Sequence, residues 1–496
     1  MMGAATAFSP ILSSAHALSR AFHHPVSPDT RRQLRAAWGP LPEQLKVPNQ
    51  FLGRQYAGCG ATIGMMPRCD FACRGCYLGA DANATPAQPV GEIKRQLRHL
   101  RAWLGEGGNV QLTDGEVTLR PEDELAELIR YAREVGLVPM VMSHGDTFRR
   151  KPGVLERLVE EAGLTELSLH VDITQRGRLG TAYKRAGAEE ALTPLRDEFA
   201  QMIRDVRRRT GRRLEVATTF TVTRDNFKDV PSVIRWALRN ADTFKMISFQ
   251  PVAQVGRTEH RMGGSAAVEQ LWARIAEGLR GTDDAHTLLE GSGLLGHPAC
   301  SRFLQGLVVA RAGAAPVFHP LFRWYDARDQ AVVQRFLDRF GGVTFRLDRK
   351  PIALARLAGM IRQDPTLFFR ELPPYLLRWL RRLDLVQPWR AIRDQTRVSY
   401  LNIVSHHFMD EAEIQTTLGR ERLAQCVFRV PIGDRLMSMC EVNALGVRDR
   451  YYEAIRTAGS RAGSAEEAGA PVRRFTPGLR DDDIRELQAE LEGSTR

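Results

Sequence analysis

The sequence predicts an α/β fold: a partial (β/α)6 barrel of the TIM type, followed by a C-terminal domain of mostly helical or mixed structure. Short apolar runs alternate with amphipathic segments from about residue 60 to 250, which is the pattern of parallel βα units. Six such units follow in series, and this favours a barrel over a flat doubly wound sheet. Reactive loops should then gather at the carboxyl ends of the strands.

The first three units are marked by apolar strands and by clear helix ends. Residues 61–66 (ATIGMM) form the first expected strand, and an apolar repeat of three and four residues then predicts a helix that stops at Gly105. Residues 110–113 (VQLT) are the second strand. The next helix begins at Pro121 with acidic residues in its first turn, and the third strand, 137–142 (LVPMVM), follows it.

The last three units repeat the same order of helix and strand. The segment GVLERLVEEAG leads into the strand ELSLHV, a long helix leads into LEVATTFTV, and VPSVIRWALRN leads into KMISFQ. The expected ranges are 153–163 and 166–171, 193–209 and 214–222, and 230–240 and 245–250.

Beyond about residue 260 this rhythm breaks, and we expect a separate region. The predicted division is an N-terminal extension at 1–54, partly disordered, a core barrel at 55–260, a C-terminal substrate or auxiliary domain at 261–457, and a flexible tail at 458–496. The extension has no acidic residue before Asp29. This composition fits either a transit peptide or a mobile arm, and we favour the arm.

Composition limits the class of protein. The chain has 496 residues, 43% of them hydrophobic, with 70 Lys and Arg against 58 Asp and Glu and a net charge of +12. The charge permits an anionic partner, but it is spread along helix faces and no nucleic-acid-binding signature accompanies it. The seven cysteines are unevenly placed, and no apolar run reaches eighteen residues. We expect a globular, cytoplasmic protein without a transmembrane helix.

Three cysteines stand in eight residues directly after the first strand. Cys69, Cys73 and Cys76 have the spacing CxxxCxxC, and Tyr77 follows at once. Three thiolates at these gaps can hold three irons of a [4Fe–4S] cluster and leave the fourth iron open. The alternatives are a zinc site, which needs a fourth cysteine or histidine nearby, and chance clustering of structural cysteines.

This motif resembles that of the radical S-adenosylmethionine (SAM) superfamily, and the resemblance covers about residues 55–260. It implies that the amino and carboxylate groups of SAM bind the open iron. It also implies that an electron from the reduced cluster cleaves SAM into methionine and a 5′-deoxyadenosyl radical, which abstracts hydrogen from a C–H bond. A low-potential flavodoxin or ferredoxin is the implied electron donor.

The resemblance also implies the residues that bind SAM. LTDGEVTLR follows the second strand, where the family has a Gly-Gly-Glu-Pro-like turn, and Gly115 and Glu116 match it whereas Asp114 and Val117 depart from it. Further SAM contacts are implied at four positions: Tyr77, Ser143, Asp172 and Gln250.

A second [4Fe–4S] cluster is a further expectation. GDRLMSMC, which ends at Cys440, is similar to auxiliary-cluster segments of molybdenum-cofactor cyclases and SPASM-type maturases. Cys300 and Cys426 would add ligands, with Cys59 as a fourth. A usual neighbouring cysteine is missing, and single buried cysteines are often only structural.

The C-terminal region carries the candidates for substrate handling. Residues 366–395 mix tryptophan, phenylalanine and leucine with arginine, a pattern that suits either peripheral contact with a membrane surface or a lid helix on the barrel. The membrane alternative would favour a lipid or isoprenoid substrate over another small molecule. His406 and His407 are candidate catalytic acid–base groups, although adjacent side chains face different sides, so at most one should lie in the site.

The sequence therefore predicts a radical SAM enzyme that activates a C–H bond of an unidentified substrate. Two alternatives remain open. One is a SPASM-like enzyme that modifies peptides, which requires the second cluster, and the other is a non-catalytic metal-binding module that binds nucleic acid.

Overall fold

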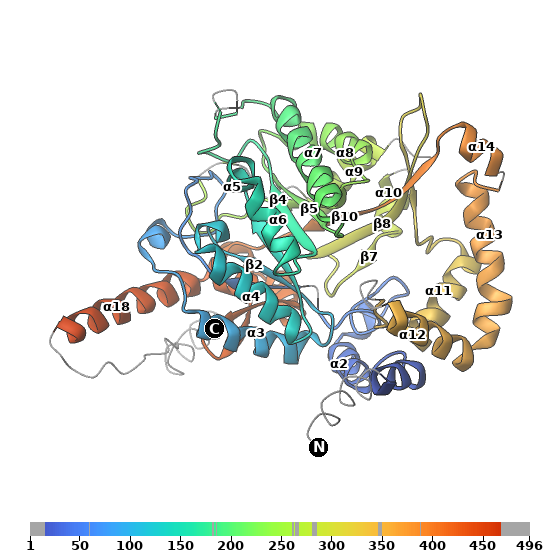
Figure 1. The fold of residues 1–496 in the computed structure, drawn as a ribbon, viewed down its shortest axis with the longest axis horizontal. Helices are drawn as coiled ribbons and strands as arrows, with labels where there is room; N and C mark the ends of the chain where they lie inside the picture. The colour runs from blue at the N-terminus through green and yellow to red at the C-terminus, as the bar shows by residue number, and fades with distance from the viewer. Residues whose placement is uncertain are drawn as a thin grey trace, which may run out of the picture.

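The computed structural model describes residues 15–58, 60–180, 183–184, 186–259, 262, 267–279, 285–345, 350–386 and 388–467. Cys59, the expected boundary at residues 260–261 and residues 468–496 of the expected tail lie outside this part of the chain. Within it, one twelve-stranded sheet organises the molecule (Figure 1).

The six expected strands form the centre of that sheet. They are β1 (Gly60–Gly64), β2 (Asn109–Thr113), β3 (Val138–Ser143), β4 (Glu166–His170), β5 (Glu215–Val222) and β6 (Phe244–Pro251). Each pairs in parallel with the next in the order β1-β2-β3-β4-β5-β6. This arrangement confirms the partial barrel and brings six carboxyl ends to one edge.

Strands from the C-terminal region extend the sheet at both sides. β10 (Arg397–His406) pairs in parallel with β6, and β8 (Ser301–Ala310) then pairs antiparallel with β10. On the other side, β11 (Phe428–Ile432) pairs in parallel with β1, and β12 (Arg435–Ser438) closes a hairpin with β11. Two short strands, β7 (Gly293–Leu294) and β9 (Val317–Pro320), pair with β8. The sheet stays open between β12 and β7, so the barrel is partial.

Helices between the central strands cover one face of the sheet. They include α3 (Val90–Leu104), α4 (Glu122–Glu134), α6 (Pro152–Glu160), α7 (Thr193–Thr210) and α8 (Val230–Arg239), close to the expected ranges, with the short α5 (Asp146–Arg150) before α6. In Figure 1, α4, α6 and α7 lie in front of the strands. Their apolar sides and the strands share one core, to which Leu97, Leu112 and Ile203 belong. This packing fixes the strand ends that carry the site.

The C-terminal helices form two groups. α11 (Ala327–Phe340), α12 (Lys350–Gln363), a π-helical turn at Leu367–Glu371, α13 (Leu372–Arg382) and α14 (Pro388–Arg393) lie on the right in Figure 1. Their buried cluster includes Phe51 of the N-terminal extension. The second group is α15 (Glu411–Ile414), α16 (Thr417–Ala424), α17 (Met439–Ala444) and α18 (Val447–Glu467), and α18 lies at the left.

Further helices are α2 (Pro28–Trp38), α9 (Val268–Leu279) and α10 (Ala285–Glu290), and residues 15–23 are also helical. Among the described residues, no helix combines the length and the apolar character that crossing a bilayer requires.

Candidate functional site

A cavity of about 220 Å³ lies at the carboxyl ends of the central strands. Its walls come from the strand ends, from the cysteine loop after β1 and from segments near α17. Among the lining residues are all three loop cysteines together with Tyr77, Gly115, Glu116, Ser143 and Gln250. The structure thus brings most of the predicted site residues into one space.

Backbone hydrogen bonds hold the cysteine loop in place. The Ala72 N–H donates to the carbonyl of Arg176 (2.9 Å), and the Arg74 N–H donates to that of Thr174 (2.9 Å). On the other side, the Arg257 N–H donates to the carbonyl of Cys76 (3.0 Å). Because two neighbouring loops fix its backbone, the cysteine loop presents its thiols in a defined arrangement.

The three thiols suit a cluster better than a single zinc ion. All three are free. One zinc ion about 2.3 Å from each sulfur would bring them within about 4.6 Å of one another. Among the described residues, the one set of three potential ligands that converges within 4.8 Å is Cys69, Asp70 and His144. The wider separation of the three sulfurs fits ligands of different irons in a [4Fe–4S] cluster.

Burial opposes ionisation of the Cys69 and Cys73 thiols. It raises the pKa of Cys69 to about 12 and raises that of Cys73 as well. A raised pKa makes Cys69 and Cys73 poor free thiolate nucleophiles at pH 7, and a bound metal cation is one way to ionise such a thiol.

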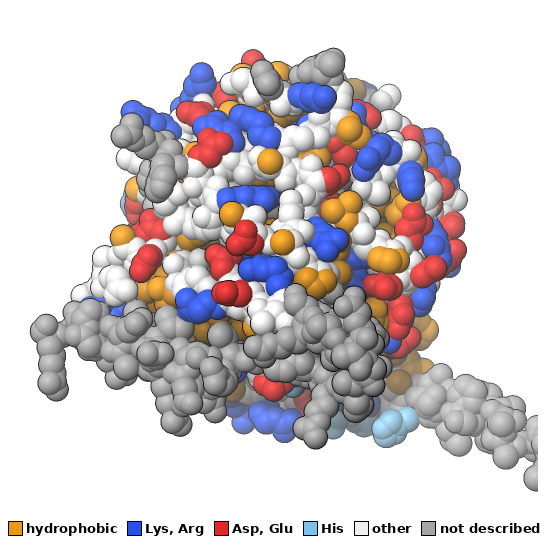
Figure 2. All heavy atoms as spheres, turned by 90° about the vertical axis from the view of Figure 1, so that its left-hand side faces the viewer, with side chains coloured by type: hydrophobic (Ala, Val, Ile, Leu, Met, Phe, Trp, Pro, Cys, Tyr) orange, Lys and Arg blue, Asp and Glu red, His pale blue; other side chains and the backbone are white. Residues whose placement is uncertain are grey.

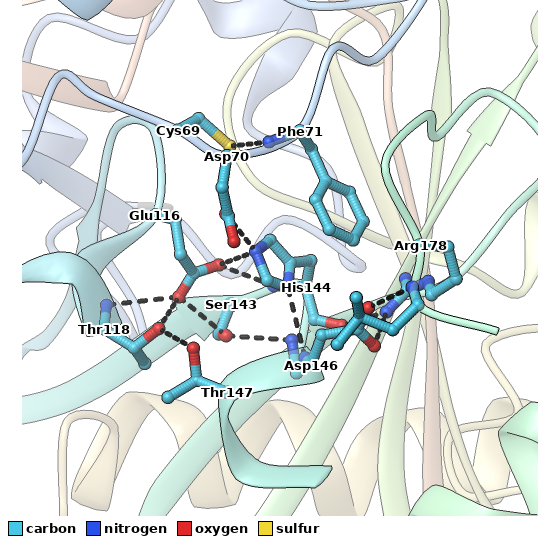
Figure 3. Close-up of polar contacts among 12 residues, drawn as sticks. Cys69, Asp70, Phe71, Glu116, Thr118, Ser143, His144, Asp146, Thr147 and Arg178 are labelled. Atoms are coloured by element: carbon cyan, nitrogen blue, oxygen red, sulfur yellow. Dashed lines mark hydrogen bonds and ion pairs between the residues drawn. The ribbon is translucent and has the colours of Figure 1, made fainter. Parts of the chain in front are cut away.

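The Glu116 carboxylate is buried and accepts several hydrogen bonds (Figure 3). The Thr118 hydroxyl donates to it at 2.6 Å, the Ser143 hydroxyl at 2.8 Å and the His144 N–H at 2.9 Å. These contacts join the end of β2 to the end of β3 and fix the negative charge in the cavity wall. A fixed carboxylate at this place can bind a cationic group without first reorganising.

His144 links this wall to the cysteine loop. Its Nε2 lies 2.8 Å from an Asp70 oxygen, and its ring stacks on Phe71 at 3.8 Å. Figure 3 shows Arg178 and Asp146 on the side of His144 away from Glu116. A 3.0 Å ion pair connects Arg178 with Asp146. The spacing of residues in the sequence gave no signal for these contacts.

The backbone conformation at position 115 requires a glycine. Its φ is +44°, and an added Cβ would lie 2.2 Å from the carbonyl oxygen of Arg68. The neighbouring Glu116 N–H donates to that same carbonyl at 2.8 Å. The turn therefore packs directly on the entry to the cysteine loop.

Replacing Gly115 by alanine should destabilise the protein by at least about 1–2 kcal/mol, since the left-handed backbone alone costs that much and the close backbone contact adds to it. Urea unfolding measures the change. Gly91→Ala, at a helical position where no atom lies within 4 Å of the added Cβ, is the control and should be neutral or slightly stabilising. Equal midpoints for both variants would contradict this account.

Asp114, which departs from the family pattern, forms a buried network that the sequence analysis missed. Tyr77 donates its hydroxyl proton to Asp114 at 2.9 Å, and Arg448 and Tyr452 at the start of α18 also bind this carboxylate. The Arg448 guanidinium lies 5.0 Å from the centre of the Tyr77 ring. These contacts attach the C-terminal helix to the first two strands.

Asp172 lies behind the cavity wall, whereas His170 lines the cavity. The Asp172 carboxylate accepts hydrogen bonds from the Thr174 N–H (2.8 Å) and the Thr221 N–H (2.7 Å) and contacts His170. Burial alone would raise the pKa of Asp172, but His170 and these hydrogen bonds outweigh it and lower the pKa to about 2. The carboxylate therefore orients His170 and the β4 end.

Neither candidate histidine is among the residues that line the cavity. Burial lowers the pKa of His406 to about 4 and that of His407 to about 3, so both are neutral at pH 7. The Nδ1 of His406 lies 2.8 Å from the Ser301 hydroxyl. The Nε2 of His407 is buried without a hydrogen-bond partner among the described residues.

Cys300, Cys426 and Cys440 gather near this second histidine. The Arg422 Nε–H donates to the Cys300 sulfur (3.3 Å), and the His407 N–H donates to the Cys300 carbonyl (2.8 Å). Burial raises the pKa of Cys300 and, to about 12, that of Cys440, and the nearby Cys426 adds to both shifts. Cys440 also lines the cavity. Three thiols from distant segments thus lie in one neighbourhood.

Comparison with known proteins finds similarity over part of this chain. A family model of the radical SAM superfamily matches residues 63–237. A 7,8-dihydro-6-hydroxymethylpterin dimethyltransferase from Methanocaldococcus jannaschii is 28% identical over 203 residues, which cover 40% of this chain and 38% of that protein. The chain therefore matches about two fifths of the length of this curated relative.

Two solved structures show similarity over less than half of this chain. Streptococcus suis SuiB bound to S-adenosylmethionine is 15% identical, with a TM-score of 0.29, and the match covers 42% of this chain and 44% of SuiB. Native anSMEcpe with bound AdoMet and Cp18Cys peptide is 10% identical, with a TM-score of 0.32, and the match covers 44% of this chain and 57% of that one.

Proposed function

We propose that this chain, whose residues 63–237 match the family model of the radical SAM superfamily, binds a [4Fe–4S] cluster at Cys69, Cys73 and Cys76 and cleaves SAM reductively. The observation that carries the proposal is the cysteine loop, which presents three free thiols at a cavity formed by the ends of six parallel strands. When bound, the reduced cluster supplies the electron that converts SAM to methionine and a 5′-deoxyadenosyl radical for C–H activation.

The residues of the chain bind SAM and exclude water. The fixed Glu116 carboxylate attracts the SAM ammonium. The turn at Gly115 brings its backbone close to the cysteine loop. Tyr77, Ser143 and Gln250 supply further polar groups at the wall. Met142, Val252 and Phe408 give the cavity apolar sides, which keep water from a reactive radical.

Electron paramagnetic resonance of the reduced, reconstituted protein tests SAM binding at the cluster. We expect a signal of a [4Fe–4S]⁺ cluster that changes when SAM is added, because SAM would bind next to the cluster. Glu116→Gln should keep the signal but need more SAM to change it. Purified protein that holds zinc instead of iron, and that shows salt-sensitive affinity for nucleic acid, would favour the non-catalytic binding module.

We also propose a second [4Fe–4S] cluster at Cys300, Cys426 and Cys440. In support, the three thiols are free, they come together from separate segments, and Cys440 faces the cavity. His407 is a candidate fourth ligand, since its buried Nε2 lacks a hydrogen-bond partner among the described residues. A second cluster at this place would fit the SPASM-like alternative, in which the substrate is a peptide.

The iron content per chain distinguishes a protein with one cluster from a protein with two. With two clusters, we expect about eight irons per reconstituted chain, and about four in Cys426→Ala. The variant should still cleave SAM, because the cysteine loop is unchanged. About four irons in both proteins would contradict the second cluster and would make these cysteines structural.

The substrate and the reductant complete the proposal. We propose a lipid or isoprenoid substrate, supported by the apolar cavity wall, and a low-potential flavodoxin or ferredoxin as the electron donor. The division into a core barrel at 55–260 and a substrate domain at 261–457 is part of the same proposal.

A further inference from the structure

The helices α13 and α14 and the turn before them expose many large apolar side chains. Seven of the seventeen exposed large hydrophobic residues of the described chain lie between residues 369 and 392: Phe369, Leu376, Leu377, Leu380, Val386, Trp389 and Ile392. The most exposed are Trp389 at 79%, Ile392 at 74% and Phe369 at 69%. We call these seven residues the apolar surface. Such a concentration marks an interaction site rather than ordinary surface variation.

The opposite side of the molecule has no comparable group in view. Figure 2 looks from the left-hand side of Figure 1, away from α13, and shows hydrophobic side chains scattered singly among basic and acidic ones. Single exposed hydrophobic residues are normal in proteins and need no partner. The apolar surface therefore differs from the described part of the face that Figure 2 shows.

α13 has two apolar sides. Tyr375 and Trp379 face the core of the C-terminal helices. Leu376, Leu377 and Leu380 span an arc of about 100° next to them and are all exposed. A stable helix has thus already buried one apolar side and still presents a second, which packing within the described chain does not explain.

Positive charge surrounds the apolar surface. Residues 366–397 contain seven arginines and three acidic residues. Arg378 and Arg382 are used internally, since both bind the buried Asp329 at 2.8 and 2.7 Å. The exposed Arg370 and Arg381, in contrast, have no ion pair with the described residues. Their guanidinium groups are available to an external anion.

We propose that the apolar surface docks on an anionic phospholipid membrane. Tryptophan, phenylalanine and leucine enter the boundary between headgroups and acyl chains, while Arg370 and Arg381 extend to lipid phosphates. Charge complementarity favours this occupant, because an apolar area bordered by unpaired arginines matches a bilayer that is apolar inside and negative at its surface. The docking does not depend on SAM cleavage.

Vesicle co-sedimentation tests the proposal with the purified full chain. We expect binding to phosphatidylcholine vesicles that contain phosphatidylserine, and weaker binding to phosphatidylcholine alone or at high salt. The double variant Leu376→Glu/Trp389→Glu should lose at least tenfold in binding. Arg370→Gln and Arg381→Gln should each lose about fivefold on the anionic vesicles.

Leu418→Glu is the matched control. Leu418 lies on α16 and is 49% exposed, close to the 54% of Leu376, but it is outside the apolar surface. It should bind vesicles as the unchanged protein does. The proposal is overturned if the unchanged protein fails to bind vesicles. It is also overturned if the control Leu418→Glu loses as much binding as Leu376→Glu/Trp389→Glu. A third contradicting result would be an unchanged protein that is dimeric and does not bind vesicles, and that becomes monomeric with Leu376→Glu. The apolar surface would then join two copies of this chain.

Discussion

Replacing Cys73 by alanine should abolish SAM cleavage and remove the iron held by the cysteine loop. Cys73 is the middle thiol of the three, and its side chain lines the cavity. With two thiolates left, the cluster loses one of its three protein ligands, and no other cysteine of the loop can replace it. We expect 5′-deoxyadenosine formation to fall below detection, which is a loss of more than a thousandfold if the unchanged protein turns over at about 1 per second.

The control is Ala72→Ser, an exposed position in the same loop that leaves all three thiols in place. This variant should retain iron and activity within about twofold, because only the Ala72 backbone N–H makes a contact that the loop needs. Measurable SAM cleavage by Cys73→Ala after full reconstitution would show that the loop does not hold the cluster.

Replacing Asp114 by alanine should destabilise the protein by about 3–5 kcal/mol. The change leaves the Arg448 guanidinium buried without its carboxylate partner, and the side chains of this pair are 3% and 1% exposed. Tyr77 and Tyr452 lose the same acceptor. Urea unfolding should record the loss as a lower midpoint with an unchanged slope.

A double-mutant cycle identifies the cause. Asp114→Ala combined with Arg448→Met removes both charges and should recover much of the stability, because no buried ion then lacks a partner. A loss below about 1 kcal/mol in Asp114→Ala, or simple addition of the two single effects, would contradict the role given to this network.

The sequence was sufficient to predict the central barrel, because each βα unit repeats a local pattern. The six strands and their helices lie within a few residues of the expected ranges, since apolar periodicity and glycine ends act over short distances. The strands after residue 260 were not predicted. β10 pairs with β6 and β11 pairs with β1, and in both cases more than 100 residues separate the two strands. A local sequence pattern does not indicate pairing over such distances along the chain.

The site was predictable to the same degree. The cysteine spacing pointed to three thiols that line the cavity, and the segments after the strands pointed to Glu116, Ser143 and Gln250, which line it as well. The partnership of Asp114 with Arg448 was not predictable, because 334 residues separate the two. Asp172 stays a predicted SAM contact; it does not line the cavity, whereas His170, two residues before it, does.

One measurement tests the central claim most directly. Protein purified without oxygen and reconstituted with iron and sulfide is incubated with SAM, with and without dithionite, and 5′-deoxyadenosine and methionine are quantified. A radical SAM enzyme must form both products in equal amounts, and only when the reductant is present. Intact SAM after incubation with a fully loaded, reduced cluster would contradict the proposed function.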